Sequence, residues 1–296
     1  MVTLFFVSPK SSAGEIVVVG ASRQLGRHVV DGLLRAARRV RAVSRRCGSA
    51  SPGVTPCPAD VRDAQAFRSV LPGADGIFLN LPPTLGAEEL ARIGADIVAA
   101  GIPSTVLLSS DLVGSWPGSV MAAGHESEEA VLGAVLGDSL GVLRPGMFMS
   151  NDAAEWSASI RADGKVITAV PDALEAPIAP ADIAGAAVAA LLAHPDGPPP
   201  TQRLWGPQWL SARDRVTTLT EVLHRPITIV EVSAAEHAAL LARILPEPIA
   251  RQKVALRAAA PRSLADCPDA PLGKARTPYA AWAAANAAAF GIESRR

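Results

Sequence analysis

The first half of the chain alternates short apolar segments with amphipathic ones, and this alternation restricts the fold more than any other feature. The run Glu15-Ile-Val-Val-Val-Gly20 predicts a strand that ends at a glycine, and apolar residues at helical spacing then predict a helix over 24–37. Further strands are predicted at 40–43, 54–58, 76–80, 105–109 and 141–144, and helices at 63–71, 87–100 and 124–136. Apolar strands separated by helices indicate an α/β fold, in which helices cover both faces of a parallel sheet.

Charge and cysteine content exclude several classes of function. The 28 basic residues are balanced by 28 acidic ones, so no net field favours nucleic acid or an anionic membrane as partner. Cys47, Cys57 and Cys267 form no C-x-x-C pair, which argues against a disulfide framework and a metal site. No apolar stretch has membrane-spanning length, and the first residues do not resemble a signal peptide. We expect a cytoplasmic monomer or homodimer.

The turn after the first strand, Gly20-Ala-Ser22-Arg23-Gln24-Leu25-Gly26, has the composition of a phosphate-binding turn. In dinucleotide-binding folds, glycines let the backbone approach the pyrophosphate, and the next helix offers its first N–H groups to that anion. Arg23 occupies the usual place of a middle glycine, so it obstructs this approach unless it swings outward, where its guanidinium can pair with phosphate. The context predicts a Rossmann-type doubly wound sheet, although two ordinary turn glycines give the same spacing.

Side chains at the ends of the later strands predict which dinucleotide binds. Arg45 and Arg46 end the second strand, where a protein that prefers NAD carries an acid for the ribose hydroxyls. A guanidinium forks onto the 2′-phosphate that a carboxylate would repel, so NADP(H) is predicted over NAD(H), unless both arginines are merely solvated. The other predicted cofactor contacts are Asp60 and Val61 at the adenine, Asn80, Leu81 and Pro82 at the ribose and pyrophosphate, and Ser109.

Past Asn151 the pattern changes, which predicts a second lobe. Trp156 and the segment 165–170 are followed by predicted helices at 181–193, 211–223, 233–245, 247–260 and 277–290, a strand at 227–232 and a loop at 194–200. We expect residues 14–150 to form the dinucleotide-binding domain after a loose lead-in. Residues 151–296 are expected to form a smaller carboxyl-terminal α/β lobe that binds substrate or acts as a lid, with some segments returning to the main domain.

Further short motifs follow the glycine turn along the chain. They are Val40-Arg-Ala-Val-Ser-Arg45, Ala59-Asp-Val-Arg-Asp63, Val106-Leu-Leu-Ser-Ser110, His125-Glu-Ser-Glu-Glu129, Leu143-Arg-Pro-Gly-Met-Phe-Met-Ser-Asn151, Ile178-Ala-Pro-Ala-Asp-Ile-Ala-Gly185, Trp205-Gly-Pro-Gln-Trp-Leu-Ser211 and Thr277-Pro-Tyr-Ala-Ala-Trp282. Over roughly residues 15–290 the chain resembles the NmrA-like, atypical short-chain dehydrogenase/reductases. The resemblance implies NAD(P)(H) as cofactor and a substrate pocket between the lobes, near 144–149.

The chain departs from that family's usual chemistry at the proton donor. Short-chain reductases ordinarily protonate the developing alkoxide with a Tyr that is activated by a Lys four residues on and assisted by a Ser. The one tyrosine, Tyr279, lies in the last predicted helix and forms no Y-x-x-x-K pair. His125 and Glu129 have that spacing instead, and Ser110 and Asp111 follow the fifth strand. Ser110, Asp111 and His125 are therefore the candidate catalytic residues.

Three functions are compatible with these residues. The first is a reductase that transfers hydride to a ketone or quinone carbonyl and gains most of its rate from positioning. Its proton would come from Ser110, His125, water or a phenol of the substrate. The second is a non-catalytic protein that senses NADP(H), as some NmrA-like members do, and the third is a lyase or isomerase with His125 as base. The resemblance and the arginine- and alanine-rich composition suggest a ketoreductase for an aromatic polyketide of angucyclinone type in antibiotic biosynthesis.

The residues after the sixth strand are the candidate substrate contacts: Met147, Phe148, Met149, Asn151 and Trp156. Met and aromatic side chains beside a cofactor suit a flat, polarizable aromatic ligand, and a place in the core is the alternative.

The remaining chemistry-bearing side chains are predicted to lie outside any site. His194 and His237 lack metal-ligand spacing and are expected to be exposed, and no metal site is predicted. A solvent-facing role for His125 and a turn-capping role for Asp111 stay open as alternatives to catalysis.

Overall fold

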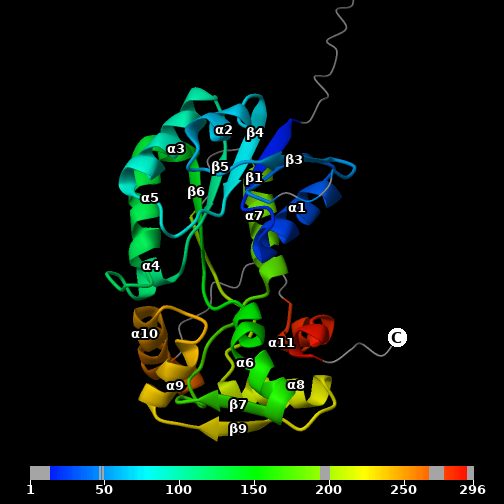
Figure 1. Ribbon diagram of the computed structural model, residues 1–296, viewed down its shortest axis with the longest axis vertical. Helices are drawn as coiled ribbons and strands as arrows, with labels where there is room; N and C mark the ends of the chain where they lie inside the picture. The colour runs from blue at the N-terminus through cyan, green and yellow to red at the C-terminus, as the bar shows by residue number, and fades with distance from the viewer. Residues whose placement is uncertain (1–13, 47, 49, 194–200, 267–276, 292–296) are drawn as a thin grey trace, which may run out of the picture.

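The computed structural model describes residues 14–46, 48, 50–193, 201–266 and 277–291. The predicted lead-in and the loop at 194–200 lie outside these residues, as do Cys47 and Cys267. The described chain forms two lobes, which Figure 1 shows one above the other. None of its helices is long and apolar enough to cross a membrane.

A parallel sheet is the centre of the upper lobe. Across this sheet the described strands are β3 (Val54–Pro58), β2 (Arg39–Ser44), β1 (Glu15–Val19), β4 (Ala74–Leu79), β5 (Thr105–Leu108), β6 (Leu140–Pro145) and β8 (Gln202–Leu204). The order reverses between β1 and β4, as in a doubly wound fold. The first six strands confirm the predictions, whereas β8 was not predicted because three residues are too short to show a period.

Side chains of β1 alternate between two cores, because successive residues of a strand point to opposite faces. Val17 and Val19 pack beneath α2 (Ala64–Ser69), α3 (Ala87–Ala99) and α5 (Ala123–Leu136). Ile16 and Val18 pack on the other face, beneath α1 (Gln24–Arg35) and α7 (Pro180–Leu192). Both faces of the sheet are therefore buried, and α7 returns to this lobe from the second half of the chain.

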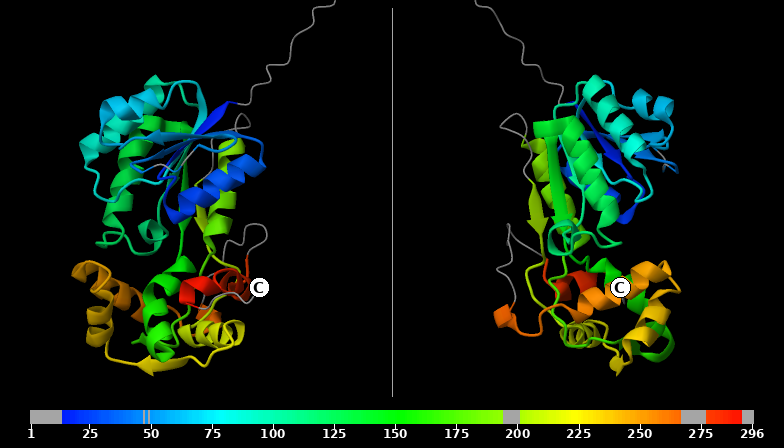
Figure 2. Two further views of the ribbon diagram at one scale, coloured as in Figure 1. Left: turned by 45° about the vertical axis from the view of Figure 1, so that its right-hand side comes forward. Right: turned by 90° about the vertical axis from the view of Figure 1, so that its left-hand side faces the viewer.

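The lower lobe is built from the second half of the chain. It contains α6 (Ser150–Asp163), α8 (Ala212–Val222), α9 (Ala234–Leu241), α10 (Glu247–Ala258) and α11 (Tyr279–Ala285) beside the parallel pair β7 (Lys165–Thr168) and β9 (Thr228–Glu231). Figure 2 shows these elements below the sheet from two further sides. The short α4 (Leu112–Ser115) and the 3-10 turns Gly137–Ser139, Leu264–Asp266 and Ala287–Phe290 complete the described elements. Helix α6 was not predicted, because its polar sequence has few apolar residues at helical spacing.

The turn between β1 and α1 requires both of its glycines. Gly20 has a φ of +76°, and a Cβ there would lie 2.8 Å from the carbonyl oxygen of Asn80. A Cβ at Gly26 would lie 2.2 Å from the carbonyl oxygen of Gly20, so α1 rests directly on the backbone of the turn. This contact positions the first turn of α1 at the end of the sheet.

The Gly26→Ala variant should lose roughly 3 kcal/mol of unfolding free energy, because the added methyl group meets backbone atoms and lifts α1 off the turn. Gly133→Ala is the matched control, since no atom lies within 4 Å of an added Cβ at this position in α5. That control should gain about 0.5 to 1 kcal/mol from helix propensity. Urea denaturation measures both values, and equal stabilities would contradict the tight contact.

Candidate functional site

Two hollows lie at the carboxyl ends of the parallel strands, where ligands of such sheets bind. The first, which we call the small cleft, has a volume of about 320 Å³ and lies at the ends of β1 to β4. The second, the large cavity, has a volume of about 810 Å³ and lies at the ends of β5, β6 and β8. The segment 174–176 and α10 of the lower lobe also line the large cavity.

The small cleft has the donors that an anionic ligand needs. Arg23, Arg45 and Arg62 line it against one carboxylate, that of Asp60. The amino terminus of α1 adds N–H groups, since its N-cap residue makes no side-chain capping bond. This set of groups fits the pyrophosphate and the 2′-phosphate of NADP(H).

Arg23 is exposed, and its side chain reaches from the turn to the wall of the small cleft. Its Nη1 donates to Oδ1 of Asn80 at 3.3 Å and to the carbonyl oxygen of Leu81 at 3.4 Å, so the guanidinium lies across the end of β4. Beside it, the hydroxyl groups of Ser22 and Ser44 are 2.6 Å apart and join the turn to the end of β2. The end of β2 is thereby held next to the glycine turn.

Most predicted cofactor residues meet at the small cleft. Those that line it are Gly20, Ser22, Arg23, Arg45, Asp60, Val61, Asn80 and Pro82. Five others do not: Leu25 and Leu81 are buried in the two sheet cores, Gly26 packs on the turn, and Gln24 and Arg46 are exposed outside the lining. Ser44, Arg62 and Thr84 line the cleft but were not predicted.

Ser109 lies at the large cavity and takes part in a network below it. Its hydroxyl donates to Glu129, and Glu129 also accepts from Nε of Arg144 at 2.9 Å and from Nη2 of the same guanidinium. This bond to Glu129 raises the pKa of Arg144 above its usual value. Ser109 thus lines the large cavity and not the small cleft, and its contact with the cofactor stays a prediction.

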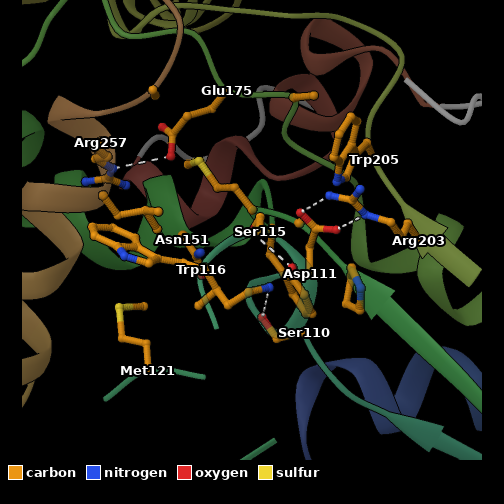
Figure 3. A pocket seen from close by; sticks show the side chains of 18 of the residues that line it. Ser110, Asp111, Ser115, Trp116, Met121, Asn151, Glu175, Arg203, Trp205 and Arg257 are labelled. Atoms are coloured by element: carbon orange, nitrogen blue, oxygen red, sulfur yellow. Dashed lines mark hydrogen bonds and ion pairs between the residues drawn. The ribbon is translucent and has the colours of Figure 1, made fainter. Parts of the chain in front are cut away.

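Asp111 also lines the large cavity, and its carboxylate is held by Arg203 of β8. Nε and Nη2 of Arg203 donate to the two carboxylate oxygens at 2.5 and 3.0 Å, as Figure 3 shows. This pairing leaves Asp111 poorly placed to act as an acid. Ser110 lines the same wall and accepts a bond from the N–H of Leu112 at 3.3 Å, which does not use its own proton.

His125 stands at the start of α5 and lines the large cavity. Its Nδ1 lies 2.9 Å from Oε2 of Glu128, a buried carboxylate one helical turn further on. This contact holds the ring, and it leaves Nε2 as the nitrogen that can meet a ligand. His125 is therefore the best-oriented of the three predicted catalytic residues.

The predicted substrate residues divide between cavity and core. Met147, Phe148 and Asn151 line the large cavity. Met149 and Trp156 are 1% and 3% exposed and belong to the core of the lower lobe, so their prediction as substrate contacts is corrected. Helix α6 is the reason, because it begins at Ser150 and turns its apolar side into that core.

A buried ionic network supports the cavity wall from the lower lobe. Arg215 donates to Asp152 at 2.9 Å and to Glu175 at 2.8 Å, and Tyr279 donates its hydroxyl to Asp152 at 2.7 Å. Burial raises the pKa of Asp152 to about 6 against the opposing charge of Arg215. Tyr279 is 1% exposed, so the only tyrosine of the chain is a structural residue.

Helix α10 joins the same network. Arg257 donates to Glu155 at 2.7 Å and to Glu175 at 3.4 Å, and Lys253 forms an ion pair with Glu155. Burial opposes ionisation of Glu155, but the charges of Arg257 and Lys253 prevail and hold its pKa at about 2. These ion pairs hold α10 in place where it lines the large cavity.

His237 was expected to be exposed, but the structure shows that it is buried. It is 2% exposed, and its Nδ1 accepts the N–H of Ala169 at 3.2 Å. Burial and the nearby charge of Arg257 lower its pKa to about 4. Among the described residues, no group of His, Cys, Asp and Glu side chains is arranged to hold a metal ion.

Arg203 of β8 and Lys253 and Arg257 of α10 line the large cavity, and no sequence signal assigned them to a site. Trp205 and Trp209 also line it; they belong to the motif at 205–211 but were not predicted as site residues. Only the folding of the lower lobe back onto the sheet brings them to the site.

The strand order and the glycine turn define a Rossmann-type doubly wound α/β fold, with the two hollows at the carboxyl ends of its strands. The NmrA-like family matches residues 12–196, and the chain belongs to this family. It is 32% identical to a (4-alkanoyl-5-oxo-2,5-dihydrofuran-3-yl)methyl phosphate reductase of Streptomyces griseus subsp. griseus, over 94% of this chain and 100% of that protein.

Solved structures share the fold. The NADPH complex of quinone oxidoreductase QOR2 from Escherichia coli has a TM-score of 0.68 and 24% identity, over 82% of this chain and 89% of that one. The triphenylmethane reductase of Citrobacter sp., complexed with NADP(H), has a TM-score of 0.72 and 20% identity, over 92% of this chain and 99% of that one.

The His237→Asn variant should lose less stability than the wild type as pH falls from 6.5 to about 4. In this window the unfolded chain binds a proton on the imidazole and the folded protein does not, so acid favours unfolding; above it the contribution is fully present. Asparagine keeps an acceptor for the Ala169 N–H and does not titrate.

The control is His224→Asn, at an exposed histidine with a φ of +49°, which asparagine tolerates. Urea denaturation across this pH range should give His224→Asn the same pH profile as the wild type. Parallel profiles for the wild type and His237→Asn would instead show that His237 does not cause the acid sensitivity.

Proposed function

We propose that this protein is an NADP(H)-dependent reductase that delivers hydride to an electron-poor carbon conjugated with a carbonyl group. The observation that carries the proposal is the large cavity, which has an oriented histidine on its wall and lies along the same strand edge as the small cleft. The Streptomyces relative, named as a reductase, supports it, as do the two structural neighbours, named as NADPH-dependent quinone oxidoreductase and triphenylmethane reductase.

The small cleft is the proposed place of the cofactor, which supplies the hydride when bound. The turn at Gly20 and the start of α1 would receive the pyrophosphate. Arg45 would receive the 2′-phosphate, because it lines the cleft and no carboxylate among the described residues pairs with it. This assignment supports a preference for NADP(H) over NAD(H).

His125 is the proposed proton donor. Glu128 holds its ring at the cavity wall, which is what a general acid requires. Ser110 is the second candidate donor on the same wall, whereas Asp111 is assigned to Arg203 and not to proton transfer.

The proposed substrate is a flat, conjugated carbonyl compound. Aromatic and methionine side chains gather around the large cavity: Trp116, Met121, Met147, Phe148, Trp205 and Trp209. An aromatic polyketide ketone, a quinone and the unsaturated lactone in the relative's name share a carbon made electron-poor by conjugation with a carbonyl. Such a substrate stabilises its own developing negative charge, which explains why the usual Tyr and Lys are dispensable.

Purified protein should oxidise NADPH in the presence of at least one member of a panel of quinones, hydroxylated aromatic ketones and a (4-alkanoyl-5-oxo-2,5-dihydrofuran-3-yl)methyl phosphate. Absorbance of NADPH follows the reaction, and NADPH affinity is measured alongside. Tight NADPH binding without turnover of any panel member would favour the alternative function, an NADP(H)-sensing protein without activity.

Arg45→Asp should weaken NADPH binding by about 10- to 100-fold and leave NADH binding unchanged or improved, because the new carboxylate repels the 2′-phosphate. Arg46→Asp is the matched control, since Arg46 is exposed next to Arg45 but does not line the cleft. Titration of the protein fluorescence with each nucleotide gives the affinities. Equal losses for NADPH and NADH in Arg45→Asp would remove the 2′-phosphate role.

His125→Ala should lower kcat by about 10²-fold or more while NADPH affinity is retained, because the proton donor is lost and the small cleft is untouched. Glu128→Gln should cause a smaller loss of kcat, since the ring stays but is held less firmly. Turnover by His125→Ala at the wild-type rate would assign the proton to Ser110, water or the substrate.

A further inference from the structure

Among the described residues, the arginine and lysine side chains that line the large cavity are those of Arg203, Lys253 and Arg257. The side chains of Lys253 and Arg257 are 15% and 5% exposed, and both are engaged with Glu155 beneath the cavity. The Nε of Arg257 donates to Glu175. Arg203 differs, because its side chain is 43% exposed and sits on β8 at the opposite wall.

Arg203 is held so that one edge of its guanidinium stays open. Its Nε and Nη2 donate to Asp111, and the guanidinium carbon lies 4.7 Å from the centre of the Trp205 ring. No acceptor among the described residues bonds to Nη1. The two contacts therefore fix the direction of the group and leave N–H donors unused (Figure 3).

The neighbouring arginine shows what a purely internal pair looks like in this fold. Arg144 of β6 stands opposite Arg203 in the strand register and forks onto Glu129 in the same way. Arg144 does not line the large cavity, and its pair ties β6 to α5. Arg203 repeats this arrangement on the wall of the cavity, where its open edge has no role in packing.

The chemistry of the open edge selects the ligand. A planar guanidinium binds oxyanions through parallel N–H groups, and phosphate offers the matching oxygens. Asp111 balances the charge of Arg203. An oxyanion at the open edge would therefore be held by directional N–H bonds and not by a net positive charge. The aromatic and methionine side chains take up the rest of the cavity and suit the uncharged, conjugated part of the same molecule.

We infer that Arg203 binds a phosphate monoester carried by the substrate, and that Asp111 and Trp205 are positioning residues for its guanidinium. This inference rests on the proposed reductase function and names the substrate class of that site. The anchored phosphate sets how the conjugated carbons lie along the strand edge between His125 and the small cleft.

The test compares a (4-alkanoyl-5-oxo-2,5-dihydrofuran-3-yl)methyl phosphate with the same compound carrying a free hydroxyl in place of the phosphate. In Arg203→Gln, kcat/KM for the ester should fall by about 10- to 100-fold, while kcat/KM for the alcohol should stay within about threefold of the wild type. Asp111→Asn should raise KM for the ester and leave kcat close to the wild-type value. Arg251→Gln, at a 74% exposed arginine of α10 outside the cavity, should change neither substrate.

Calorimetry measures binding of the ester to the NADP⁺-loaded protein. This measurement tests the phosphate site independently of the reductase function. Suppose that the wild type binds the ester, that Arg203→Gln does not, and that the wild type consumes no NADPH with it. This combination would support the phosphate site and reject the reductase function. Three results would overturn the phosphate site: equal kcat/KM for ester and alcohol in the wild type, equal losses for both in Arg203→Gln, or no ester binding by the loaded wild type. Urea denaturation confirms that each variant is folded.

Discussion

Burial of both faces of the parallel sheet is the constraint on which the rest of the structure depends. Because Val17 and Val19 enter one core and Ile16 and Val18 enter the other, neither face has room for a polar ligand. Polar side chains are displaced to the carboxyl ends of the strands, where the chain leaves the sheet and helices begin. The small cleft and the large cavity both lie along that edge, so one packing requirement brings the proposed cofactor and substrate sites together.

Buried charges within the lower lobe help to hold the segments that line the large cavity, beside the apolar packing of α10 on α9. Donors and carboxylates alternate from α11 to α10, beginning with the hydroxyl of Tyr279 and continuing through Asp152, Arg215, Glu175, Arg257, Glu155 and Lys253. Buried ion pairs add little net stability, but removal of one partner leaves an uncompensated charge, so their geometry is strongly specified. Segment 174–176 and α10 are held against the cavity in this way.

Helical spacing on α5 explains how the site is organised without the usual Tyr and Lys. His125 and Glu128 are three residues apart and meet on one side of the helix, at the cavity. Glu129, one residue further on, faces the sheet and receives Ser109 and Arg144 instead. The residue at the position of the lysine is thus a structural acid, and the proposed proton donor has its own carboxylate partner.

The sequence by itself determined the strands β1 to β6 and the glycine turn, because strand and helix periods and a turn's need for glycine are local properties. It also predicted a ligand site at the carboxyl edge of the sheet, where the two hollows lie. Tertiary structure decided the rest. Trp156 was predicted at the substrate and lies in the core, and His237 was predicted in solvent and is buried. The helix α10 was predicted, but neither its place at the cavity nor that of Arg203 had a local signal, since both depend on how the second half of the chain folds back over the sheet. Motifs specify which groups a strand end offers, whereas packing between lobes decides which of them face one another.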